Sequence, residues 1–519
     1  MKKDSLLLKS DFPDADVIRV DDTYYMVSTT MHFMPGCVLL RSYNLTDWEI
    51  LTHVYDVLEQ TDKESLMGDA CAYGQGMWAA SLRYHGGMFY ICFVANDTGK
   101  TYLYRARDIM GPWEKSTIEG FYHDSSLLFD DDGRIYIAYG NKQIYVTELN
   151  EEMTGPKPGG LHKMVVEDTG DVRLGYEGTH FYKINGKYYL FFIHWGKAEN
   201  ARRTEACFVS DHIDGPYRGQ DVLDDDRGYC NQGVAQGGIV QTPKGEWYAV
   251  LFQDSGAVGR IPVLVPVTWN NDFPVFGMAG KVPDKLLVSD NRPGYQYEPI
   301  YGNDDFSYKP DAAGKFHLHP RWEWNHIPDE SLWTIDQKKS ALRLTTGRLC
   351  ANVTQAVNTL TQRLMFPGSD VTVTVNGEHL REGDVAGLCM LQGDYGLVGI
   401  RKEKGHYYAV MIVRPSEAEN VMAKPSDKTV GKELVRVPLS SPQAVFRVMT
   451  DFQNMRDTAQ FFVKQGDDWQ KLGEGMKLYF KLDYFCGVRA GLFCYSTETQ
   501  GGTAEFMDFR HRVIEHNEK

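Results

Sequence analysis

Residues 10–30 read SDFPDADVIRVDDTYYMVSTT: an acidic segment around a Phe-Pro pair runs directly into two alternating apolar strands joined by a polar turn. Alternation on both sides of a short polar turn is the pattern of a β-hairpin. Taken alone, the acidic cluster could be a solvated turn, a calcium loop or one half of an acid/base pair. The choice depends on whether the segment recurs, because an internal repeat indicates the architecture and therefore where the segment lies in it.

The hairpin recurs throughout the first 290 residues. Each copy is an apolar strand, a tight turn with Gly or Asp, and a second strand that carries an aligned tyrosine: Tyr25, Tyr90, Tyr136, Tyr189 and Tyr248. The later copies are ASLRYHGGMFYICFVA (80–95), SSLLFDDDGRIYIAYG (125–140), THFYKINGKYYLFFIH (179–194) and GIVQTPKGEWYAVLFQ (238–253). A spacing of roughly 45 to 65 residues is typical of propeller blades. With the strand-like pieces between the hairpins, the sequence predicts a five-bladed β-propeller over residues 1–290.

The register of this repeat shows which residues occupy the position equivalent to Asp14 in the other blades. The positions eleven or twelve residues before the aligned tyrosines are Asp14, Trp78, Asp124, Glu177 and Gln236. If each hairpin is the innermost of its blade, these positions lie where five strands enter at the axis, so three carboxylates face one funnel. Any one of the acids could simply cap a turn before its strand. Three acids in joint register favour a functional site.

Three carboxylates on one axis suit the hydrolysis of a glycosidic bond. One carboxylic acid protonates the leaving oxygen, and a carboxylate on the opposite face acts as base or nucleophile. A third carboxylate can raise the pKa of the acid and hold its rotamer. This chemistry requires no metal or cofactor. Two other acidic runs, DDDG (130–133) and LDDDRG (223–228), are interpreted as a hairpin turn and a solvated loop, since neither has EF-hand spacing.

Five segments resemble glycoside hydrolase family 43 over roughly residues 8–285. They are FPDADVIRVDDTYYMVSTT, MWAASL, HDSSLLFDDDGRIYIAYG, GYEGTHFYKINGKYYLF and VGRIPVLVPVTWNNDFPVFG. The resemblance implies a five-bladed propeller with the activity of inverting, exo-acting β-xylosidases, α-L-arabinofuranosidases or related arabinanases. It places the general base at Asp14, the pKa-modulating and orienting Asp at Asp124, and the general acid at Glu177. The repeat register selects the same three residues independently.

The resemblance also implies sugar contacts. Trp78 matches the Trp of a Trp-Ala-Pro segment that lines the sugar site, although Ala80 replaces the Pro, and Arg260 matches an Arg that contacts the sugar. The axial position where many members place a His, beside a bound calcium or a structural water, is Gln236 here. An amide can still hold a water, but this sequence gives a structural calcium no support.

The segment STTMHFMPGCVLLRS (28–42) is expected to form a loop at the rim of the funnel. It would present Met31, His32 and Phe33 to the sugar, with His32 as a rim contact and not as an acid or base. The alternative for Phe33 is packing within the blade.

The pattern of the first 290 residues stops at a run rich in Pro, Gly and Asp, and we interpret residues 291–303 as a linker. Residues 304–519 alternate as antiparallel strands, which predicts a two-sheet β-sandwich. This part resembles the concanavalin A-like C-terminal domain of β-xylosidase-type members, which packs on the propeller and lends a loop that helps to close the pocket. The aromatic stretch 304–333 is the expected contact. A carbohydrate-binding role for this domain is the alternative.

Composition excludes several classes of partner. The net charge is −15 and no Lys/Arg cluster stands out, so a nucleic-acid partner is not expected. No apolar run reaches membrane-spanning length, so no membrane contact is expected, and the protein is placed in the cytoplasm, or in the periplasm if a leader was removed. The nine cysteines are odd in number and lack a C-x-x-C pair, so we interpret them as buried thiols.

Together these observations predict an inverting, exo-acting glycoside hydrolase. It would release terminal α-L-arabinofuranosyl or β-D-xylosyl groups from plant hemicellulose oligosaccharides. A catalytically silent sugar-binding propeller and an endo-arabinanase are the alternatives. Three mutually repelling carboxylates argue against the first, and the appended sandwich, which would cover an open cleft, argues against the second.

Overall fold

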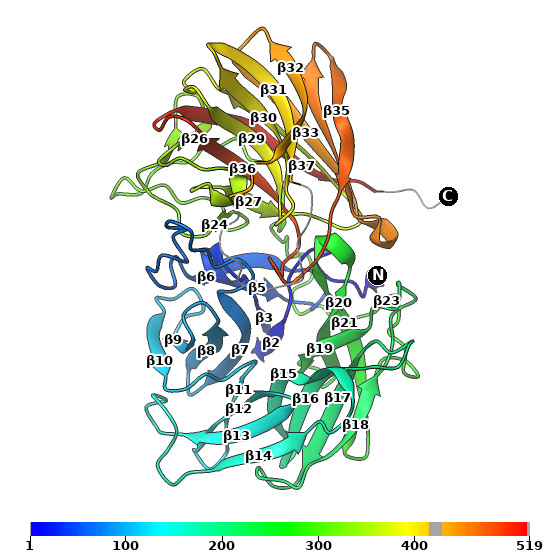
Figure 1. Cartoon of the computed structure of the whole chain (residues 1–519). Coiled ribbons are helices and arrows are strands. Elements are labelled where there is room, and N and C mark those ends of the chain that lie inside the picture. The colour runs from blue at the N-terminus through cyan, green and yellow to red at the C-terminus, as the bar shows by residue number, and fades with distance from the viewer. Residues whose placement is uncertain (1, 415–427, 516–519) are drawn as a thin grey trace.

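The structure is a computed structural model that describes residues 2–414 and 428–515. Its first part folds as five four-stranded antiparallel sheets, and its second part as two larger antiparallel sheets (Figure 1). In Figure 1 the propeller, coloured blue to green, lies below the sandwich, coloured yellow to red. The predicted all-β fold, a five-bladed propeller followed by a β-sandwich, is confirmed.

The five blades follow one another along the chain. They are β2 (Asp16–Val20), β3 (Thr23–Ser28), β5 (Gly36–Ser42) and β6 (Glu49–Tyr55); β7 (Met77–His85), β8 (Met88–Ala95), β9 (Lys100–Ala106) and β10 (Glu114–Ile118); β11 (Ser126–Phe129), β12 (Ile135–Asn141), β13 (Gln143–Leu149) and β14 (His162–Glu167); β15 (Val172–Ile184), β16 (Lys187–Gly196), β17 (Arg203–Ser210) and β18 (Arg218–Leu223); β19 (Val234–Gln241), β20 (Trp247–Asp254), β21 (Arg260–Asn270) and β22 (Phe273–Phe276).

The predicted hairpins form the innermost strand pairs of the blades. The first strands β2, β7, β11, β15 and β19 contact one another in a closed ring, so that β19 lies against β2. The N-terminal segment helps to close the ring: β1 (Lys3–Asp4) pairs with β23 (Lys285–Leu286), and Leu6 bridges to Val263 of β21. The five strand entrances therefore meet at one end of a single axis.

The sandwich consists of an eight-stranded and a seven-stranded sheet. The first runs β32 (Lys432–Leu439), β31 (His406–Val413), β30 (Gly396–Glu403), β29 (Asp384–Leu391), β36 (Arg489–Ser496), β27 (Leu360–Arg363), β24 (Glu323–Asn325) and β4 (Phe33–Met34); the second runs β25 (Trp333–Asp336), β26 (Ala341–Thr345), β37 (Thr503–Val513), β28 (Ser369–Asn376), β33 (Gln443–Asp451), β34 (Thr458–Gln465) and β35 (Asp468–Lys477). Leu388 and Leu492 of the first sheet share one buried core with Val373 and Phe446 of the second.

The two domains share a sheet. Strand β4 comes from the β3–β5 connection of blade one, yet it pairs with β24 of the sandwich. A second buried core joins the domains at this junction, because Phe33 and Leu66 of the propeller pack with Cys389 and Phe493 of the sandwich. Hydrogen bonds and apolar packing therefore position the propeller and the sandwich relative to each other.

All nine cysteines are free thiols, and all of them except the exposed Cys230 are buried. The interpretation as buried thiols is thus correct for eight and wrong for Cys230. Three single 3-10 turns, η1 (Gly256–Val258), η2 (Val353–Gln355) and η3 (Gln453–Met455), are the helical elements of the described ranges. None of them has the length or the apolar character needed to cross a membrane.

Candidate active site

The entrance of every inner strand carries one residue with left-handed backbone. These residues are Asp14 (φ 54°), Ala79 (φ 33°), Asp124 (φ 47°), Gly178 (φ 66°) and Gln236 (φ 64°). In blades two, four and five the ladder between the two inner strands also shifts register at this place. Such irregularities re-aim a side chain next to a functional site. The repeat thus interrupts its own strands at the positions that the sequence register selected or one residue after them.

Asp14 lies at the bottom of this funnel with only 7% of its surface exposed. Its Oδ1 accepts hydrogen bonds from Nη1 of Arg260 (2.8 Å) and from Nε2 of Gln236 (3.0 Å). Burial raises the pKa of Asp14 above its ordinary value, the Arg260 charge opposes this shift, and the Asp124 charge adds to it. The carboxylate is therefore fixed in position by two donors and remains coupled to the second acid on the axis.

Asp124 and Glu177 form the other half of the site, with His123 between them. Asp124 is buried, and its Oδ2 accepts the Gly178 N–H at 3.1 Å. Glu177 projects from β15 and accepts a hydrogen bond from the Asn141 side chain. The His123 Nε2 lies 3.6 Å from Oδ2 of Asp124 and 3.8 Å from Oε2 of Glu177. The chain thus places one imidazole beside both carboxylates.

The charges of these three groups shift the pKa values of Asp124 and His123. Burial raises the pKa of Asp124; the His123 charge lowers it and the Glu177 charge raises it further. The Asp124 carboxylate is the main reason that the pKa of His123 rises to about 9. The sequence interpretation missed His123 and Asn141. The signal for His123 was available, because it directly precedes an acid already selected by register.

The same three residues have the ligand types that a divalent metal uses. One ligand atom from each of His123, Asp124 and Glu177 lies within 4.8 Å of the others. A metal bound there would need deprotonated ligands, and it would occupy the groups that an acid catalyst keeps for a proton. At the axial position, Gln236 instead directs its amide towards Asp14. That the protein requires no metal stays a prediction.

One wall of the site comes from both domains. The Trp78 ring lies 5.2 Å from the ring of Phe485, and the Arg260 guanidinium lies 4.5 Å from the centre of the same Phe485 ring. Phe485 belongs to the sandwich, in the connection between β35 and β36. Arg260 thus contacts Asp14, Trp78 lies 6.3 Å from the His123 ring, and the sandwich covers both with an aromatic side chain. That they contact a sugar stays a prediction.

Asp11 anchors this covering loop. Its Oδ1 accepts the Arg260 backbone N–H at 2.8 Å, and its Oδ2 accepts the Gly487 N–H at 2.7 Å. A Cβ at Gly487 would lie 2.2 Å from the Val258 carbonyl oxygen, so the close approach requires glycine. A residue three positions before Asp14 therefore fixes both the arginine and the loop that carries Phe485.

The loop that closes the pocket is not the one that the sequence predicted. The aromatic stretch 304–333 does meet the propeller, but its part from Lys315 to Trp333 faces blade one. The pocket wall comes instead from residues 478–488, as Phe485 shows. No periodic or local pattern in the sequence marks that loop.

The structure also corrects the rim contacts. Met31, His32 and Phe33 are each 1% exposed and belong to the interdomain junction, so they do not present their side chains to a sugar. Phe33 pairs in β4 with the sandwich, and its ring lies 3.6 Å from the Arg489 guanidinium. Burial lowers the pKa of His32 to about 3, consistent with a neutral structural imidazole. The reason is tertiary: a partner strand almost 300 residues later covers this loop.

Comparison with known proteins decides the family. The model of glycosyl hydrolases family 43 matches residues 5–274, and the model of the beta xylosidase C-terminal concanavalin A-like domain matches residues 314–512. The chain belongs to glycoside hydrolase family 43. It is a glycoside hydrolase, and its second domain is the concanavalin A-like domain that the sequence predicted.

Individual relatives cover most of this family 43 chain. A "Beta-xylosidase" of Formosa agariphila is 25% identical over 96% of the chain and 88% of its own length. A "Non-reducing end alpha-L-arabinofuranosidase" of Bacteroides ovatus is 26% identical over 82% of the chain and 79% of its own length. A solved structure described as a bifunctional GH43-CE protein of Bacteroides eggerthii is 38% identical with a TM-score of 0.89; it covers 99% of this chain, which spans 64% of that longer protein.

Proposed function

We propose that this family 43 hydrolase is an inverting, exo-acting enzyme that removes terminal α-L-arabinofuranosyl or β-D-xylosyl groups from hemicellulose oligosaccharides. The observation that carries the proposal is the meeting of Asp14, Asp124 and Glu177 at one end of the propeller axis. Relatives named as a β-xylosidase and as a non-reducing end arabinofuranosidase support a pentose as the released sugar.

In the proposed mechanism, Asp14 is the general base. Its Oδ1 is held by Arg260 and Gln236, and the carboxylate would accept a proton from the attacking water. The Arg260 charge favours the ionised carboxylate that a base requires, against the effect of burial on its pKa. An inverting enzyme needs room for this water, with about 6.5–9.5 Å between the two catalytic carboxyl groups.

Glu177 is the proposed general acid, and Asp124 its modulator. Asp124 is coupled by charge to both Glu177 and His123, and its bond to the Gly178 N–H ties it to the residue that follows Glu177. The Asn141 amide orients the Glu177 carboxyl group. A proton delivered from Glu177 to the departing oxygen would be replaced from solvent, since the Glu177 side chain is 19% exposed.

The covered wall supports exo action. Phe485 closes the funnel over Trp78 and Arg260, and a covered pocket accepts the end of a chain more readily than its interior. The test is hydrolysis of 4-nitrophenyl β-D-xyloside and α-L-arabinofuranoside side by side, with the product anomer followed by proton NMR and the products from an oligosaccharide identified by size. Release of monosaccharide with inverted configuration is expected. Release of longer fragments would refute exo action, and retained configuration would refute the assignment of Asp14 as base.

A further inference from the structure

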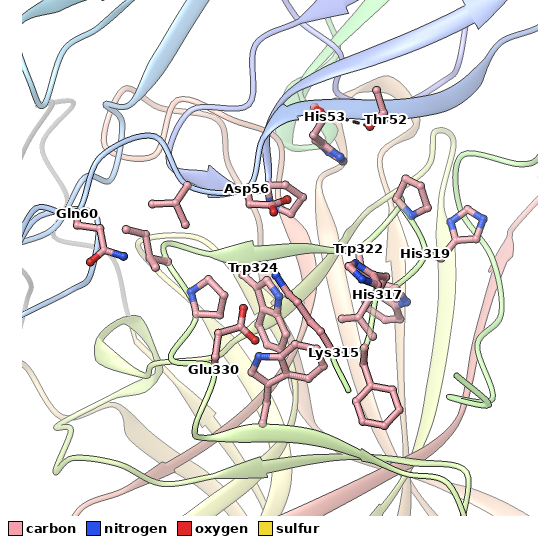
Figure 2. A pocket seen from close by; sticks show the side chains of 18 residues that line it. Thr52, His53, Asp56, Gln60, Lys315, His317, His319, Trp322, Trp324 and Glu330 are labelled. Carbon is pink, nitrogen blue, oxygen red and sulfur yellow. Dashed lines mark hydrogen bonds between the residues drawn. The ribbon is translucent and has the colours of Figure 1, made fainter. Parts of the chain in front are cut away.

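A second cavity lies at the domain junction, outside the active site. It has a volume of about 340 Å³ and opens between blade one and the sandwich segment from Lys315 to Trp333 (Figure 2). Its propeller wall is formed by Pro35 and by the end of β6 with the loop that follows, from Thr52 to Gln60. None of the three acids on the axis lines it. Pockets between domains are preferred places for small-molecule binding, and this volume is at the low end of the usual range.

Tryptophans form part of the apolar lining of this cavity. The rings of Trp324 and Trp333 lie 5.2 Å apart at an interplanar angle of 48°. Trp324 is fixed in β24, where it pairs with Met34 and with Leu360 on either side. The Trp333 indole N–H is buried and has no hydrogen-bond acceptor among the described residues. The cavity therefore offers a rigid aromatic surface, while the Trp333 N–H itself is shielded from it.

Polar side chains from both domains form the rim. Asp56 and Gln60 come from the propeller, Lys315 and Glu330 from the sandwich, and all four are exposed. None of the four side chains forms a hydrogen bond or an ion pair with another residue of the described ranges. Figure 2 shows Asp56 on the propeller side facing Trp324 and Glu330 on the sandwich side. Unpaired donors and acceptors of both signs thus surround an aromatic floor.

This combination fits a neutral polyhydroxylated ligand. A sugar ring presents C–H faces that pack on aromatic rings, while its hydroxyls both donate and accept. The rim carries acidic groups (Asp56, Glu330) as well as a basic one (Lys315), so its charge selects neither an anion nor a cation, and a purely apolar ligand would cover these groups without pairing them. We propose that the cavity is a second carbohydrate-binding site, which holds a short stretch of pentose polysaccharide. The choice of pentose rests on the proposed function.

Such a site would act by tethering. A polysaccharide held at the cavity raises the effective concentration of its chain ends near the active site, without any new contact there. The two sites border the same short piece of blade one. Pro35 lines the cavity, and Thr29, six positions earlier, lies beside Asp14 and Ala79. Polymeric substrates should therefore benefit from the cavity, whereas aryl glycosides should not.

Binding is measured by calorimetry with xylohexaose on the full chain carrying Glu177→Gln, which slows hydrolysis. Two binding events are expected. Adding Trp333→Ala should weaken the second event about tenfold, as expected for loss of one aromatic platform. Because Trp333 also packs against the sandwich core, the double substitution Asp56→Ala and Gln60→Ala serves as an independent variant that leaves the core intact. It should weaken the same event. Trp469→Ala, in β35 and outside the cavity, is the matched control and should change nothing.

A single binding event that is unaffected by both cavity variants would overturn the proposal. Equal binding of maltohexaose at the cavity would overturn its preference for pentoses. In the background without Glu177→Gln, the cavity variants should hydrolyse aryl pentosides within about twofold of the unsubstituted chain, yet degrade soluble xylan more slowly. If the unsubstituted chain hydrolyses no pentoside, the proposed function fails, and the calorimetry still reports on the cavity by itself.

Discussion

Phe485 of the sandwich lies 5.2 Å, ring to ring, from Trp78 of the propeller, and the Arg260 guanidinium lies 4.5 Å from the same Phe485 ring. Since Arg260 also binds Asp14, one side chain of the second domain contacts both Trp78, the proposed sugar contact, and the arginine partner of the proposed base. The concanavalin A-like domain is thus a component of the pocket, and its removal would expose the axis.

Phe485→Ala tests this role. The expected result is a fall in kcat/KM of roughly 10²-fold, because loss of the ring lets Arg260 and the substrate move from their aligned positions. The free energy of unfolding should fall by only about 1–3 kcal/mol, since the side chain is half-buried. Kinetics and urea unfolding measure the two effects. Phe462→Ala in β34 is the control. A variant that loses stability as predicted but keeps full activity would show that the pocket does not depend on this contact.

A buried ion cluster holds the domains together at the same junction. Glu323 is 0% exposed and pairs with Arg363 (2.7 Å), with Arg489, and with His53 of blade one at 3.0 Å. Glu323→Gln leaves two buried arginines without a counter-charge, so we expect a loss of about 3–5 kcal/mol in unfolding free energy. The partly exposed pairs of Glu433 provide the control, because Glu433→Gln should cost about 0–1 kcal/mol.

The pH dependence of this loss has a defined sign. Burial alone would raise the pKa of Glu323, but the Arg363 and Arg489 charges hold it well below its ordinary value. A lowered pKa contributes stability fully above the unfolded-state value of about 4.3 and loses it as the pH falls through the folded value. The difference between the unsubstituted chain and Glu323→Gln should therefore be constant near pH 7 and shrink below about pH 4. A difference that grows in acid would contradict the ionised state.

His123 should act in the opposite direction. Its pKa is raised to about 9, mainly by the Asp124 carboxylate. A raised pKa contributes stability fully below the unfolded value of about 6.5 and loses it as the pH rises through about 9. His123→Gln should cost about 1–3 kcal/mol of unfolding free energy at pH 6 and nothing above about pH 10. The control is His85→Gln, because within the described residues the His85 side chain stacks on Phe129 and pairs with no carboxylate. An equal cost at both pH values would show that the charge on His123 does not account for the stabilisation.

The parts of the fold that the sequence predicted are those fixed by local chemistry. Each hairpin contains its own turn and its own aligned tyrosine, such as Tyr136. The five blades and the axial positions of Asp14, Asp124 and Glu177 could therefore be predicted from the register of the repeat. Phe485 and the pairing of Phe33 depend on contacts between residues that are hundreds of positions apart, and such contacts leave no periodic pattern. His123 is intermediate, because its sequence position was informative but its place between two carboxylates required the structure.

The proposed roles of Glu177 and Asp14 predict different effects on different substrates. If Glu177 protonates the departing oxygen, Glu177→Gln should slow hydrolysis of an oligosaccharide by roughly 10²–10⁴-fold. A nitrophenolate leaves with little help, so an aryl glycoside should lose far less. Asp14→Asn removes activation of the water, which every substrate needs, so both substrates should lose activity together. Measuring kcat for the two variants on both substrates gives four values. Equal losses on both substrates for Glu177→Gln would contradict its role as the acid, whereas unchanged rates in both variants would mean that these carboxylates bind sugar without catalysing its hydrolysis.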